Sequence, residues 1–201
     1  MRPFIKICGL TRPDDARLAV RMGATHIGAV RTDASPRAVT PERAREIFAV
    51  GEGNVETVFV FKNVALASVI RDAKLSGARG VQLYDASDSD VTAVASEGFR
   101  VYRVYGVDED ARVLPKLVPP PTEARPALVD VGGGGSGRRF DWSLLGERAP
   151  HATFIAGGIR PDNVGALLRR RPYGIDLASG VESSPGVKDP DKLHALFEEV
   201  S

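Results

Sequence analysis

An alternation of short apolar runs with longer amphipathic segments, repeated along 201 residues, constrains this chain more than any other feature. Because the runs are too apolar for half-exposed strands, they indicate a parallel sheet covered by helices. The expected strands are residues 4–8, 26–30, 55–61, 80–83, 100–104, 127–131, 153–156 and 174–177.

The segments between the strands have the composition of amphipathic helices. The expected helices are residues 13–22, 41–50, 65–76, 89–97, 109–117 (the weakest), 142–147, 162–170 and 190–200. Thr11 and Asp14 resemble a capping box for the first of them, and Gly23 ends it. The triplet Pro119-Pro120-Pro121 is expected to be a stiff surface loop and not a domain boundary.

Eight strand–helix units is the number that closes into a (β/α)8 TIM barrel. We therefore expect an α/β protein, a compact eight-stranded parallel barrel, with residues 1–201 forming a single domain. The length is near the lower end of the fold's range of about 200 residues upward, so the connections must be short. An open doubly wound sheet is the alternative.

Composition excludes several classes of function. Lys and Arg total 27 against 26 Asp and Glu, so the net charge of +1 provides no basic field for nucleic acid. The single cysteine cannot form an intramolecular disulfide, and the scattered histidines (His26, His151, His194) lack zinc-site spacing. No apolar run approaches the roughly 20 residues of a membrane helix. We expect a cytoplasmic protein without a metal site.

In a barrel, the loops that follow the strands form one rim, and function concentrates there. The seventh and eighth strands are followed by Gly157-Gly158 and Ser179-Gly180, whose backbone N–H groups can approach a phosphate closely. Glycines also simply turn chains, but at these two positions together we expect a phosphate site. The sixth strand ends at Asp130, before a glycine-rich run at 132–137, and the eighth ends at Asp176.

Cys8 ends the first strand and is followed by Gly9. A lone cysteine is more often an inert core residue, because it packs like a small hydrophobe. At the mouth of a barrel it can instead act as an acid, base or nucleophile if its thiolate is favoured. Asp130 across the rim is a natural partner for it; the alternative for Asp130 is a solvated strand-end carboxylate or a cap.

These strand ends carry motifs that resemble the phosphoribosylanthranilate isomerase family of tryptophan synthesis. The resemblance spans essentially the whole chain, and its most specific parts are the cysteine signature at 6–11 and the run at 179–182. In order along the chain, the motifs are KICGLT (6–11), SPR (35–37), VQL (81–83), LVD (128–130), GGSG (134–137), FDW (140–142), AGG (156–158), PDNV (161–164), DLASGVE (176–182) and PGVKD (185–189).

The resemblance implies a cofactor-free Amadori rearrangement of N-(5-phosphoribosyl)anthranilate to 1-(2-carboxyphenylamino)-1-deoxyribulose 5-phosphate. It implies that Cys8 is the general base and Asp130 the general acid, while Arg37 holds the anthranilate carboxylate. Asp176 matches a residue near the substrate's amine or ribose hydroxyls. The residues that match the phosphate site are Gly157, Gly158, Ser179 and Gly180.

The chain departs from the family pattern in three places. Tyr84-Asp85 stands where the family usually carries His-Gly, Ala29-Val30-Arg31 replaces an aromatic-rich run, and the loop after Asp130 is shorter than usual. Two alternatives stay open: a barrel isomerase for the histidine-pathway aldosamine, which uses an aspartate where Cys8 stands, and a noncatalytic phosphosugar-binding barrel. The sequence does not distinguish a monomer from a homodimer.

Overall fold

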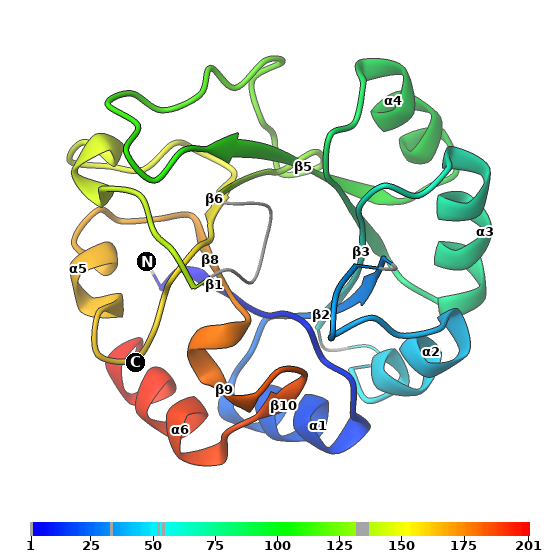
Figure 1. Ribbon diagram of the computed structural model, residues 1–201, viewed down its shortest axis with the longest axis horizontal. Coiled ribbons are helices and arrows are strands. Elements are labelled where there is room, and N and C mark those ends of the chain that lie inside the picture. Colours follow the sequence, from blue (N-terminus) through cyan, green and yellow to red (C-terminus); the bar gives the residue numbers. More distant parts are fainter. Residues whose placement is uncertain (1, 33, 52, 54, 132–136) are drawn as a thin grey trace.

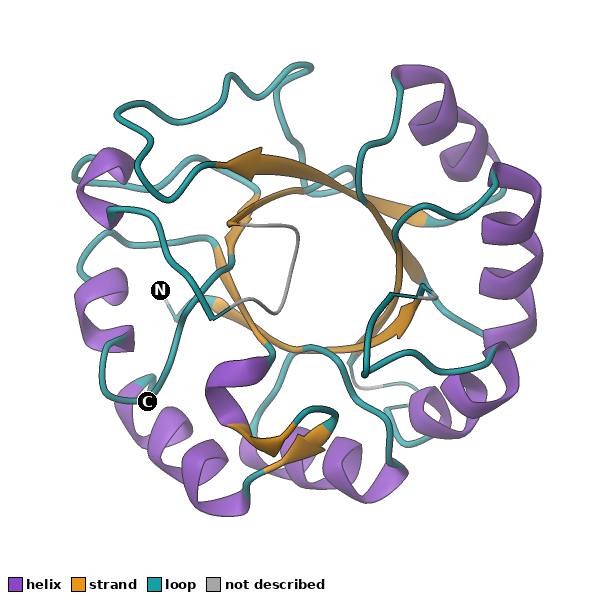
Figure 2. Ribbon diagram, in the orientation of Figure 1, coloured by secondary structure: helices purple, strands orange, loops and turns teal. Residues whose placement is uncertain are grey.

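The computed structural model describes residues 2–32, 34–51, 53, 55–131 and 137–201. Eight parallel strands close into a barrel, and the helices surround it (Figures 1 and 2). The strands are β1 (Phe4–Ile7), β2 (His26–Arg31), β3 (Glu56–Phe61), β4 (Gly80–Leu83), β5 (Arg100–Val107), β6 (Ala127–Val131), β7 (Thr153–Ile155) and β8 (Gly174–Leu177).

The ring closes because β1 pairs in parallel with β8, with Phe4 opposite Gly174 and Ile7 opposite Leu177. This confirms the expected TIM barrel and excludes the open doubly wound sheet. The helices are α1 (Pro13–Met22), α2 (Pro41–Ala49), α3 (Leu66–Ser76), α4 (Asp88–Ser96), α5 (Val164–Leu168) and α6 (Pro190–Glu199). Helix α6 lies beside α1, so the two ends of the chain share the outer layer (Figure 1).

The expected helix at 109–117 is wrong. Residues 108–126, all of which the structure describes, contain no helix, and β5 instead continues as far as Val107. Proline lacks an N–H and interrupts helices, and Pro115 and Pro119 both fall within this segment. Val113 is 77% exposed, whereas Ala111, Leu114 and Leu117 are partly buried against the core, so the segment packs as an irregular chain and not as a helix.

Three smaller expectations also need correction. The helix at 142–147 is a short 3₁₀ turn, η1 (Trp142–Leu145), because Gly146 takes a positive φ of 68° and ends it. The helix at 162–170 shortens to α5. Thr11 does not cap α1: no side chain caps that helix, and the Thr11 hydroxyl donates to the Gly186 carbonyl instead.

One end of the barrel interior is filled by aromatic side chains. Phe154 lies near the start of β7, His26 at the start of β2 and Tyr102 near the start of β5. The centre of the Phe154 ring is 5.0 Å from that of His26 and 5.7 Å from that of Tyr102. Burial lowers the pKa of His26 to about 3, so this imidazole is neutral. This end forms a packed floor, and open space is left at the carboxyl ends of the strands.

After β8 comes a 3₁₀ turn, η2 (Ser179–Val181), and then a small antiparallel hairpin of β9 (Glu182–Ser184) and β10 (Val187–Lys188). The sequence did not predict this hairpin. In the part of the chain that the structure describes, no helix is long and apolar enough to span a membrane.

Candidate active site

A cavity of about 590 Å³ opens at the carboxyl ends of the strands. Its lining comes from loops that are far apart in the sequence and meet only because the barrel closes. Every site residue expected from the sequence lines it: Cys8, Arg37, Asp130, Gly157, Gly158, Asp176, Ser179 and Gly180. The glycine-rich run at 132–136 lies outside the described residues, and the Gly137 that follows it also lines the cavity.

Asp130 is held at the end of β6 by two hydrogen bonds. Its Oδ1 accepts from the backbone N–H of Val131 at 2.8 Å, and its Oδ2 accepts from the hydroxyl of Tyr84, also at 2.8 Å. The side chain is buried, and burial raises the pKa of Asp130 to about 6 although both hydrogen bonds act to lower it. Asp130 can therefore take up and release a proton near neutral pH.

Cys8 follows β1, where its backbone N–H donates to the Leu177 carbonyl at 2.8 Å. Burial raises the pKa of the Cys8 thiol, and the ammonium group of Lys6 opposes this rise. A side chain at Gly28 would place its Cβ 3.0 Å from Cys8 Sγ and 3.3 Å from Lys6 Nζ. Glycine on β2 thus leaves the space in which the thiol and the ammonium lie together.

Lys6 is a site residue that sequence reasoning missed. It is fully buried, and its Nζ contacts both carboxylate oxygens of Asp176, at 3.0 and 3.1 Å. Burial acts to lower the pKa of Lys6, but Asp176 and Cys8 outweigh it, so that the pKa is raised and the cation persists. Lys6 stands two residues before Cys8, so its side chain points to the same face of the strand, and this spacing could have indicated it as a site residue.

The two glycine loops lie against each other, with backbone close to backbone. Gly157 and Gly158 have positive φ angles of 93° and 59°, which glycine adopts without strain. A Cβ at Gly180 would lie 1.8 Å from the carbonyl oxygen of Ile159, so no larger residue fits there. The loops can therefore present bare backbone N–H groups to an anion.

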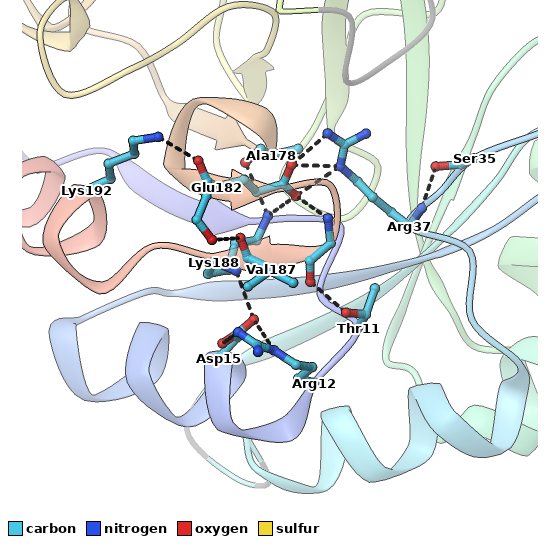
Figure 3. Close-up of polar contacts among 12 residues, drawn as sticks. Thr11, Arg12, Asp15, Ser35, Arg37, Ala178, Glu182, Val187, Lys188 and Lys192 are labelled. Atoms are coloured by element: carbon cyan, nitrogen blue, oxygen red, sulfur yellow. Dashed lines mark hydrogen bonds and ion pairs between the residues drawn. The ribbon is translucent and has the colours of Figure 1, made fainter.

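Arg37 is fixed by Glu182 of the β9–β10 hairpin (Figure 3). The Arg37 Nε donates to Glu182 Oε1 at 2.9 Å, and Nη2 donates to Oε2 at 2.7 Å. Lys188 Nζ lies 2.8 Å from Glu182 Oε1, so one carboxylate pairs with two cations. This ion pair occupies one edge of the guanidinium and leaves Nη1 outside it. Arg37 can therefore hold a ligand carboxylate only through the part of its guanidinium that Glu182 does not occupy.

Gln82 on β4 supplies a further polar group to the cavity. Its side chain is buried, and its Oε1 has no hydrogen-bond partner among the described residues. A buried acceptor without a partner is unfavourable, and a ligand hydroxyl can satisfy it. Within the described ranges, no group of three or more His, Cys, Asp or Glu side chains is arranged to hold a metal ion.

A family model described as N-(5'phosphoribosyl)anthranilate (PRA) isomerase matches residues 5–199. The chain belongs to this family. It is 36% identical over 201 residues to the N-(5'-phosphoribosyl)anthranilate isomerase of Pelobacter propionicus, covering 96% of this chain and 93% of that protein. The isomerase structure from Thermus thermophilus has a TM-score of 0.82 at 32% identity, with 98% of each chain covered.

Family members also occur as parts of longer proteins. The chain is 33% identical to the tryptophan biosynthesis protein TrpCF of Yersinia pestis, and the match covers 96% of the chain but 40% of that protein.

Proposed function

We propose that this chain converts N-(5-phosphoribosyl)anthranilate into 1-(2-carboxyphenylamino)-1-deoxyribulose 5-phosphate by general acid–base catalysis. The observation that carries this is one cavity lined both by a carboxyl and a thiol suited to proton transfer and by two glycine loops suited to phosphate. A relative that is 27% identical over 98% of this chain was solved with the reduced form of that product.

In this reaction the Asp130 carboxyl gives its proton to the ribose ring oxygen, and the ring opens to an iminium sugar. The Cys8 thiolate then removes the proton from C2, which gives an enaminol. The enaminol becomes the ketone as its hydroxyl proton moves to C1, and the proton that Cys8 took balances the one that Asp130 gave. No atoms are gained or lost, so one acid and one base suffice. Each such role is typically worth about 10²–10⁴-fold in rate.

The substrate's other groups are assigned by charge. Arg37, through the Nη1 that Glu182 does not hold, takes the anthranilate carboxylate, a charge-assisted contact. The phosphate lies against the backbone of Gly157, Gly158, Ser179 and Gly180. Asp176, held by Lys6, lies near the amine or the ribose hydroxyls.

Two alternatives make different demands on the same cavity. A histidine-pathway aldosamine isomerase needs an aspartate where Cys8 stands, and a noncatalytic phosphosugar-binding barrel needs neither Cys8 nor Asp130. Turnover separates the three functions: phosphoribosylanthranilate, made in situ because it is labile, loses its fluorescence on conversion. We expect this loss with the purified chain and no turnover of the histidine-pathway substrate; the reverse pattern contradicts the proposal, and turnover of neither supports the binding protein.

Assembly and location are further proposals. We infer that the chain works as a single barrel domain, as a monomer or homodimer, in the cytoplasm, without nucleic acid and without a cofactor. A related isomerase from Thermotoga maritima, 29% identical, is described as dimeric. Light scattering on the eluting peak of a sizing column distinguishes the two assemblies of this chain.

A further inference from the structure

Tyr84 departs from the family pattern and contacts Asp130 directly. It follows β4, it is part-buried in the cavity wall, and its hydroxyl lies 2.8 Å from Asp130 Oδ2. The ammonium of Lys62 lies 5.3 Å from the centre of the Tyr84 ring, within range of a cation–π contact. Burial and the carboxylate of Asp130 raise the pKa of Tyr84, so the phenol keeps its proton and remains a donor.

We propose that Tyr84 is a positioning residue for Asp130: its hydroxyl fixes the carboxyl group and stabilises the carboxylate left after the proton is given to substrate. This inference rests on the proposed function in one respect only, namely that Asp130 gives its proton to the substrate. The contact itself is a property of the free protein.

The two hydrogen bonds on Asp130 differ in what they can do. The backbone N–H of Val131 can only donate, so it favours the ionised carboxylate and anchors Oδ1. A phenol both donates and accepts, so Tyr84 can donate to the carboxylate and accept from the carboxylic acid. Asp130 therefore keeps a partner on Oδ2 in both protonation states, and its plane does not have to turn during proton transfer.

The other ionisable groups near Asp130 come from different elements of the barrel. Asp176 on β8 raises the pKa of Asp130, Lys6 on β1 lowers it, and Cys8 and Lys62 also line the cavity. Replacing Tyr84 by phenylalanine keeps the ring and changes none of these groups. The substitution therefore isolates the contribution of one hydroxyl.

The test is the titration of Asp130 followed by ¹³C NMR of labelled aspartate carboxyls, with the Asp130 signal identified by its loss in Asp130→Asn. A hydrogen bond to the charged form lowers a carboxyl pKa, so Tyr84→Phe should raise the Asp130 midpoint by roughly one pH unit. Tyr105→Phe is the matched control, because its hydroxyl donates to the Val118 carbonyl in an exposed loop. An Asp130 midpoint that is unchanged in Tyr84→Phe contradicts the proposal.

A second readout connects the contact to catalysis. The limb of the kcat/KM profile that follows Asp130 should move upward in Tyr84→Phe by the same amount, and it should not move in Tyr105→Phe. A purely structural role for Tyr84 changes the rate without moving this limb, which overturns the proposal. If wild-type protein turns over no phosphoribosylanthranilate, the proposed function fails, while the NMR titration still decides the role of Tyr84.

Discussion

At the scale of single residues, the side chains of Asp130 and Cys8 are both buried, and burial raises the pKa of each. It raises the pKa of Asp130 to about 6 and that of Cys8 above its ordinary value, so the free protein holds mostly carboxylate and thiol at neutral pH. The pair that the proposed mechanism requires, a carboxylic acid at Asp130 with a thiolate at Cys8, is then the minor protonation state. Between the two pKa values the population of this state is constant. A fall in pH protonates more of Asp130 and removes thiolate from Cys8 by the same factor.

We therefore predict a kcat/KM profile that is flat between about pH 6 and the Cys8 pKa and falls on both sides. Below pH 6 Asp130 is already protonated, so further protons only remove thiolate. Above the Cys8 pKa only the acid is lost. A rate measured across this range that shows no bend near pH 6 contradicts the assignment.

Most of the candidate site residues that the sequence predicted, and that line the cavity, lie at or just after strand ends. Cys8 and Asp130 are of this kind, since the carboxyl ends of parallel strands must share a rim. Lys6 and Glu182 were missed as site residues because their importance lies in partners distant along the chain. Lys6 pairs with Asp176, 170 residues away, and Glu182 with Arg37, 145 residues away. Such pairs are fixed by the closed barrel and not by local sequence.

At the scale of elements, the apolar strands were predictable and the short helices were not. A run such as β3 is buried almost throughout, and this leaves a clear sequence signal. The segment 108–126 lacks such a signal, because its prolines and exposed valines are compatible with either a poor helix or a loop. The β9–β10 hairpin also lacks a clear sequence signal. It nevertheless contains Glu182 and Lys188, and Glu182 pairs with Arg37.

We predict that Gly180→Ala damages the phosphate loops. The new Cβ would lie 1.8 Å from the Ile159 carbonyl oxygen, so the loops after β7 and β8 must separate. We expect KM to rise by about 10-fold or more, and overpacking of this kind costs on the order of 1–3 kcal/mol of unfolding free energy. The control is Gly106→Ala, where the added Cβ meets no atom within 4 Å. Wild-type KM and stability in Gly180→Ala would show that the loops are not tightly packed.

At the scale of the whole molecule, the barrel has a packed floor and a functional mouth. The floor is apolar and aromatic, whereas the mouth holds Lys6, Asp130 and Asp176, which are buried. Burying charged groups destabilises a fold unless they are paired. Under the proposed function, the buried ionisable groups at the mouth lower the stability of the fold and serve proton transfer.

Asp130→Asn should make the protein more stable above pH 6. A carboxyl whose folded pKa is about 6, against about 3.9 unfolded, binds more protons when folded, so stability falls as pH rises between those values. Removing the charge should add about 1–3 kcal/mol at pH 8 and nothing below pH 3.9. Urea unfolding at both pH values checks this; equal stabilities at pH 8 would show that Asp130 is ionised without penalty.

The single-domain prediction has a direct test in unfolding. With Trp142 as the single tryptophan, fluorescence reports on the β6–β7 side of the barrel, and far-UV circular dichroism reports on all helices. We expect both signals to change with the same urea midpoint, as one cooperative unit requires. Two separated midpoints would divide the chain into independent parts.

The proposed mechanism requires that Cys8 and Asp130 exchange protons with a phosphoribosyl substrate in one cavity. It is tested by the rate of phosphoribosylanthranilate fluorescence loss in wild type, Cys8→Ala and Asp130→Asn, with binding of the reduced product measured in parallel. We predict rapid loss in wild type, and a fall of at least about 10²-fold in each variant with binding retained. A wild-type rate in either variant would contradict the proposed mechanism.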